Sequence, residues 1–97
     1  MIKLITWEMD RSHAPADPAE RIKHTMTMCE LVKKSMEDGR IKMWGINPGA
    51  NHGFAVTESD DKEIFAGNVR YIPHVKFKVE PMLDIDEVIS TLSEFQK

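Results

Sequence analysis

The stretch over residues 39–58, GRIKMWGINPGANHGFAVTE, decides how the chain folds. It holds two short β-prone runs, 40–46 and 53–57, on either side of a turn-forming segment, 47–51. Val, Ile, Phe and Trp favour strands, whereas Pro, Gly and Asn break them. The stretch therefore predicts a β-hairpin whose loop is longer than a two-residue turn.

Ahead of the hairpin, the pattern predicts a strand and then a long helix. Residues 2–7 are apolar at both alternating sets of positions, which is typical of a strand in the centre of a sheet. Asp17, Pro18 and Glu20 form an N-terminal capping pattern, and Gly39 is a C-terminal stop. We expect a helix over 18–38 whose buried apolar face consists of Ile22, Met26, Cys29, Val32 and Met36.

A second helix is expected directly after the hairpin. Asp60 and Glu63 repeat the capping pattern, and Pro73 ends the helix because the residue before a proline resists helical geometry. A glycine inside a helix, such as Gly67, lowers the stability of the helix by about 1 kcal/mol relative to alanine. We therefore expect a close packing contact at Gly67. The apolar stripe of this helix consists of Ile64, Phe65, Val69 and Ile72.

The chain ends with a strand and a third helix. Apolar and polar residues alternate over 74–80, which predicts a half-buried strand whose two lysines suit a sheet edge. Asp84 and Glu87 form a third capping box. The apolar positions of the final helix are strongly periodic, so this helix is expected to be buried against the body or a partner chain: Ile85, Val88, Ile89, Leu92 and Phe95.

The order β-α-β-β-α-β-α predicts an α+β fold in which the first six elements form a ferredoxin-like βαββαβ sandwich. Right-handed crossovers give a four-stranded antiparallel sheet of order 4-1-3-2, with an extra C-terminal helix. The length of 97 residues indicates one domain, 1–97. Both long helices should cover one face of the sheet, which leaves an apolar face open to a partner or a ligand.

Bulk composition excludes several classes of protein. The net charge of −3 argues against a nucleic-acid binder or an anionic-membrane binder, since both need a concentrated positive face. Gly53 and Phe54 resemble a strand signature of RNA-recognition motifs, but the expected basic and aromatic neighbours are missing. The single cysteine and the short N-terminal apolar run favour a cytoplasmic protein without a membrane span.

Several phrases of the sequence carry a family resemblance: ITWEMD at 5–10, KMWG at 42–45, HGFAVTE at 52–58 and VKFKVEPML at 75–83. With the long capped helix, they resemble the small ferredoxin-like proteins of unknown function in the dimeric α/β-barrel superfamily. The resemblance implies a homodimer through sheet faces and a ligand site in a sheet–helix cleft. The superfamily includes muconolactone isomerase and antibiotic-biosynthesis-type monooxygenases, but no motif transfers either activity to a residue here.

The expected topology brings polar and aromatic residues to one end of the sheet. The end of the first strand, the hairpin tip and the start of the last strand all meet there. Within this group His74 is the first choice for a ligand contact, His52 the second and His13 the weakest. The candidate ligand-binding residues are Trp7, Asp10, Trp44, Asn47, His52, Tyr71 and His74.

The sequence is consistent with two classes of function. One is a small-molecule-binding protein, which includes a cofactor-independent enzyme; the other is a non-catalytic homodimer without a pocket. A polar loop surface is the favoured explanation of the histidine cluster, because loops carry such residues anyway. No metal-ligand spacing, phosphate loop or Ser-His-Asp pattern is present, so we predict no metal, no cofactor and no assigned catalytic residue.

Overall fold

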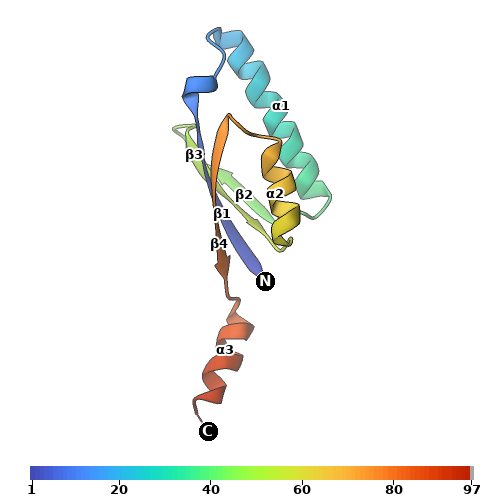
Figure 1. The fold of residues 1–97 in the computed structure, drawn as a ribbon, viewed down its shortest axis with the longest axis vertical. Coiled ribbons are helices and arrows are strands. Elements are labelled where there is room, and N and C mark those ends of the chain that lie inside the picture. The colour runs from blue at the N-terminus through green and yellow to red at the C-terminus, as the bar shows by residue number, and fades with distance from the viewer. Residues whose placement is uncertain (97) are drawn as a thin grey trace.

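The computed structural model describes residues 1–96, which form a four-stranded sheet, three α-helices and a short 3₁₀ helix (Figure 1). The protein is thus an α+β protein with the predicted order of elements. In chain order these are β1 (Ile2–Met9), η1 (Arg11–His13), α1 (Pro18–Glu37), β2 (Met43–Ile46), β3 (His52–Thr57), α2 (Asp61–Val69), β4 (Val75–Met82) and α3 (Ile85–Glu94).

The sheet is antiparallel throughout, because β1 pairs with both β3 and β4, and β3 pairs with β2. The order is β2-β3-β1-β4, which is 4-1-3-2 when counted from the β4 edge. The apolar first strand therefore lies in the centre, and the lysine-bearing strand β4 lies at an edge. Strand β1 continues past the predicted end to Met9, since Glu8 and Met9 pair with Lys76 and Val75.

Strand β2 begins later than the sequence predicts, at Met43 rather than at residue 40. The backbone amides of Arg40 and Ile41 both donate to the Ser35 carbonyl, at 2.9 and 3.2 Å. These residues therefore still wrap the end of α1 and are not free to pair along the sheet.

The two sides of the sheet are different in character. Helices α1 and α2 lie on one side (Figure 1), toward which alternate residues such as Ile5, Trp7 and Ala55 point. Because side chains alternate along a strand, the intervening residues face the other side, here called the open face. The apolar side chains of the open face come from all four strands: Ile2, Leu4, Met43, Phe54, Val56 and Met82.

Each α-helix begins at the aspartate that the sequence predicts as its cap. Asp17 accepts the Glu20 amide at 3.2 Å, Asp60 accepts the Glu63 amide at 2.8 Å, and Asp84 accepts the Glu87 amide at 2.8 Å. Only α3 has the reciprocal capping box, because the Glu87 side chain also accepts the Asp84 amide. An aspartate cap supplies an acceptor to amides that have no intrahelical partner, which fixes the helix start.

Helix α1 turns a different face to the sheet from the one that its apolar spacing predicts. Ile22 is 68% exposed, Met26 is exposed and Cys29 is a free, exposed thiol. The prediction of Cys29 as a buried core residue was therefore wrong. Two sets of positions on this helix have helical spacing, and periodicity alone does not show which set packs against the sheet. The half-buried positions are His24, Met28, Leu31, Val32 and Ser35.

Helix α2 ends at Val69, before the proline that was expected to stop it. The amides of Arg70, Tyr71 and Ile72 each donate to the carbonyl three residues earlier, so the chain tightens into turns there. The expected close contact at Gly67 is absent, because a Cβ built on that residue meets nothing within 4 Å. Gly67 instead leaves open space beside the sheet.

Helix α3 does not pack on the body of its own chain. It lies beyond the end of β4, away from the sheet and the other two helices (Figure 1), which gives the molecule a length of 63 Å against widths of 25 and 22 Å. Leu92 is 58% exposed and Phe95 is 80% exposed. The expectation of a final helix buried against the body was wrong, and burial against a partner chain stays a prediction.

Candidate functional site

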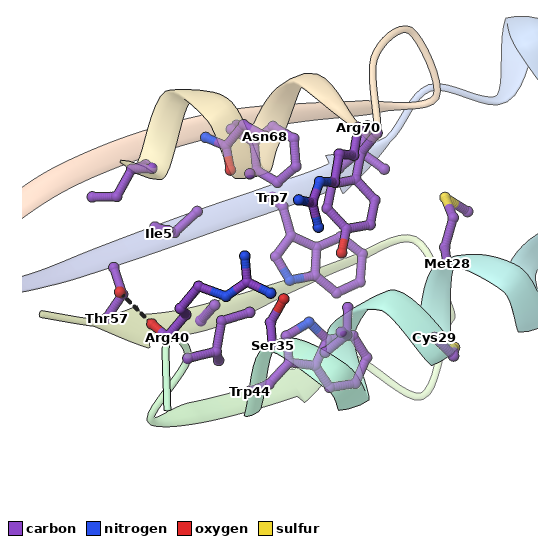
Figure 2. A pocket seen from close by; sticks show the side chains of 18 of the residues that line it. Ile5, Trp7, Met28, Cys29, Ser35, Arg40, Trp44, Thr57, Asn68 and Arg70 are labelled. Carbon is purple, nitrogen blue, oxygen red and sulfur yellow. Dashed lines mark hydrogen bonds between the residues drawn. The ribbon is translucent and has the colours of Figure 1, made fainter. Parts of the chain in front are cut away.

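An open cavity of about 140 Å³ lies between the sheet and the two helices that cover it (Figure 2). The sheet contributes apolar residues, among them Ile5, Trp7 and Trp44. Helix α1 contributes Met28 and Ser35, and α2 contributes residues of its inner side. We call this space the sheet–helix cavity. Such concave sites, mostly apolar with a few polar groups, are where small ligands bind.

Two stacked tryptophans form one wall of the sheet–helix cavity. The ring centroids of Trp7 and Trp44 lie 5.6 Å apart with 16° between the ring planes. Trp7 is 8% exposed, and its indole lies against Gly53 of the neighbouring strand, where a Cβ would come within 2.5 Å of the ring. A side chain at position 53 would therefore displace the indole, so this glycine is what lets Trp7 lie flat.

Polar groups enter the same cavity from α1, from α2 and from the segments that follow them. The close view in Figure 2 shows the Arg40 side chain reaching toward the Trp7 indole, with the Ser35 side chain beside them. Asn68 and Arg70 enter from the α2 side. Apart from these groups the wall is mainly hydrocarbon, so each polar group has a strong influence on what the cavity accepts.

Tyr71 adds a phenol to this set. Its ring meets Phe77 edge-on, with centroids 5.9 Å apart. Burial raises the pKa of Tyr71 above its ordinary value of 10.0, while the charges of Arg70 and Arg40 act in the opposite direction. The hydroxyl therefore keeps its proton at neutral pH and can donate a hydrogen bond.

A second, more polar depression lies beside the end of β1 and is here called the polar hollow. It is lined by Asp10, His24 and His74, together with Arg11 and Arg21. The His24 and His74 rings meet edge-on at 4.1 Å between centroids. Burial lowers the pKa of His74, and the neighbouring His24 and His13 lower it further.

Asp10 in the polar hollow already has structural partners. Its carboxylate caps η1 by accepting the Ser12 hydroxyl at 2.6 Å and the Ser12 amide at 3.1 Å. These hydrogen bonds lower the pKa of Asp10. Its backbone amide donates to the His74 carbonyl at 2.7 Å, so Asp10 joins the two strand ends mainly through structural contacts.

The seven residues predicted as one site are divided among separate places. Trp7, Trp44 and Tyr71 line the sheet–helix cavity, and Asp10 and His74 line the polar hollow. The structure therefore brings together the aromatic members of the set, and separately two of its polar members.

Asn47 and His52 lie away from both cavities. The Asn47 side chain accepts the Gly49 amide at 2.7 Å within the hairpin turn, and a His52 ring nitrogen contacts Asn51 at 2.8 Å. His52 pairs with Glu8 and lies on the open face, whereas His74 contacts His24 on the helix side. The structure thus does not bring His52 and His74 together, and the histidine that meets His74 is His24, which is not among the candidate residues.

Several residues of the sheet–helix cavity could not be singled out from sequence. Arg40 and Arg70 follow the ends of helices, where a basic residue is common simply because it interacts favourably with the helix dipole. Ser35 and Asn68 look like ordinary helix-surface residues. The one signal in the sequence is Gly67, because a glycine inside a helix lowers the stability of the helix. The sequence predicts a close packing contact at Gly67, whereas the structure has open space there.

Two further properties concern residues 1–96. No helix in this range is long and apolar enough to cross a membrane. The same range holds no group of three or more His, Cys, Asp or Glu side chains that is arranged to hold a metal ion.

The chain is thus an α+β protein with an open cavity between its sheet and two of its helices. Compared with known families, the chain matches the domain of unknown function DUF3303 over residues 1–96. It therefore belongs to that family. No curated protein matches the chain.

Proposed function

We propose that this protein binds a small, flat aromatic molecule in the sheet–helix cavity. The observation that carries the proposal is the stacked Trp7–Trp44 pair, which lines an open cavity. Stacking on such a pair is favourable for any planar ring. The cavity volume of about 140 Å³ suits one ring, since a cavity of about 150 Å³ holds benzene in another protein.

Binding can be followed through the indole N–H groups, because both tryptophans of the chain line the cavity. The N–H correlation spectrum should show two indole signals, and titration with benzamide or benzoate should move both of them in a saturable manner. Affinities in the millimolar range are expected for ligands of this size. If neither probe moves the indole signals saturably at about 10 mM, the proposal is wrong.

Catalysis is not part of the proposal. Among the described residues that line the cavity, Glu63 is the one carboxylate, and no histidine is present. General acid–base chemistry needs a proton donor and acceptor within hydrogen-bond reach of the reacting group. The arrangement therefore supports binding, and the alternative of a homodimer without a pocket is less favoured because a cavity is present.

We further propose that the fold is the ferredoxin-like sandwich of the dimeric α/β-barrel superfamily and that two copies pair through their open faces. Apolar side chains such as Leu4, Phe54 and Val56 support this pairing, because their burial would be favourable. The open face also carries both lysine and glutamate on β4, so a second copy offers complementary charges.

We also propose that residues 1–97 form a single domain and that the protein is cytoplasmic. The free thiol of Cys29 supports the cytoplasmic location.

Sedimentation tests the dimer. The wild-type chain should sediment as a dimer at micromolar concentration, and Phe54→Lys should shift it toward monomer, because a charge would be buried in the interface. Phe65→Lys is the matched control, since Phe65 is 69% exposed on α2 away from the open face. A monomeric wild type, or equal effects of both variants, would rule out pairing through the open face.

A further inference from the structure

Two buried hydrogen-bond donors of the sheet–helix cavity have no acceptor among the described residues. They are Nε1 of Trp7 and Nε of Arg40. Buried donors are nearly always paired, because an unpaired one loses its bonds to water without replacement. Figure 2 shows the Arg40 side chain reaching toward the Trp7 indole, so both donors serve one part of the cavity.

Arg70 and Tyr71 add further donors to the cavity lining, while Ser35 and Asn68 can both donate and accept. Arg70 carries a positive charge, and the Tyr71 hydroxyl keeps its proton. The Arg40 guanidinium has one carboxylate partner, Asp38 at 2.9 Å, and that pair is solvent-exposed. Arg40 therefore still has donors to offer inside the cavity, since a guanidinium carries five N–H groups.

The single carboxylate of the cavity lining lies apart from Arg70 and Tyr71. Glu63 is in the first turn of α2, whereas Arg70 and Tyr71 follow the last turn. Arg70 comes seven residues after Glu63, which corresponds to roughly 10 Å along the helix axis. The positive charge of Arg70 therefore has no carboxylate beside it among the described residues that line the cavity, which favours an anionic ligand group.

We propose that the ligand of the sheet–helix cavity is a monocyclic aromatic carboxylate. Its ring lies against the Trp7–Trp44 pair, and its carboxylate accepts hydrogen bonds from Nε of Arg40 and Nε1 of Trp7. The inference rests on the proposed function, because it names the chemistry of the molecule that the same cavity binds. A carboxylate is a preferred partner of an arginine guanidinium, because the opposite charges strengthen the hydrogen bonds and the planar donors match the carboxylate oxygens.

Three probes of nearly equal shape separate charge from fit: benzoate, benzamide and benzylammonium. Titrated into the wild-type protein and followed by the two indole signals, benzoate should bind about tenfold or more tightly than benzamide. Benzylammonium should bind most weakly, because it meets Arg40 and Arg70 with a like charge. The Trp7 N–H signal should move downfield most with benzoate, which supplies the strongest acceptor.

Variants assign the preference to Arg40. Arg40→Met should reduce benzoate affinity to the benzamide level, with an unchanged melting temperature because the only side-chain partner in the described structure is the exposed Asp38. Arg21→Met is the matched control, since it removes the same charge from the polar hollow and should leave benzoate binding unchanged.

The outcomes distinguish this inference from the proposed function. Equal affinities of benzoate and benzamide for the wild type would overturn the anion preference, while the cavity would stand as a site for neutral rings. Equal losses in Arg40→Met and Arg21→Met would show a general charge effect and would overturn the role of Arg40. Failure of all three probes to move the indole signals would overturn the proposed function itself.

Discussion

Gly53→Ala should destabilise the protein by about 3 kcal/mol or more, the upper part of the range for overpacked sites. A Cβ at this position would collide with the Gly45 carbonyl oxygen and come within 2.5 Å of the Trp7 ring. One of these neighbours is backbone and the other is buried, so neither can move cheaply. The β2–β3 pairing and the flat position of the indole should both be lost, and denaturant unfolding measures the cost.

Gly49→Ala is the matched control for this substitution. A Cβ at Gly49 would lie 2.9 Å from Oδ1 of Asn47, so the Asn47 side chain must rotate and give up the hydrogen bond that it accepts from the Gly49 amide. Both residues are exposed in the hairpin turn, so the cost should be about 1 kcal/mol, the net contribution of one hydrogen bond. Equal costs at the two glycines would contradict the proposed packing of Trp7 on Gly53.

Gly67→Leu should abolish ligand binding while it makes the protein more stable. Gly67 lines the sheet–helix cavity, and no atom lies within 4 Å of a Cβ built there, so a leucine side chain has room to fill the space. The removal of a mid-helix glycine alone should add about 1 kcal/mol to the free energy of unfolding. Benzoate titration and denaturant unfolding of the same sample measure both effects.

Ala66→Leu is the control for the added side chain. Ala66 is exposed on α2 and does not line the cavity, so this variant should bind benzoate as the wild type does. If Gly67→Leu binds benzoate with unchanged affinity, the ligand does not occupy the sheet–helix cavity. A loss of stability in Gly67→Leu would instead mean that the open space beside α2 is not there.

Most of the fold could be predicted from local chemistry. Aspartates at 17, 60 and 84 mark the three helix starts, and each one caps its helix in the structure. The apolar first strand indicates a central place in the sheet, which it occupies. These features depend on neighbours within a few residues, so a single sequence suffices to see them.

The packing of the helices depends on tertiary contacts that no local pattern contains. Helix α1 has apolar spacing at Ile22 and Met26, yet its half-buried side includes His24 and Ser35. Helix α3 has a regular apolar stripe, but the short connection after β4 carries it away from the body. The periodicity predicts that this apolar face is buried, but it does not predict whether the same chain or a partner chain buries it.

The candidate site was only partly predictable for the same reason. The topology brings strand ends together, so Asp10 and His74 do meet, as their strands indicate. His52 lies on the open face, whereas His74 belongs to the turn before β4 and contacts His24 on the helix side, and this depends on a turn geometry known only from the structure. Arg40 enters the cavity through its side-chain conformation, which sequence does not specify.

The central claim is that the Trp7–Trp44 wall holds an aromatic acid. The most direct measurement is the set of nuclear Overhauser effects between the ring protons of bound benzoate and the protein. We expect contacts to the indole protons of both tryptophans and to Ile5 on the same side of the sheet. Contacts confined to Leu4 and Phe54 on the open face, or to the exposed stripe of α3, would contradict it.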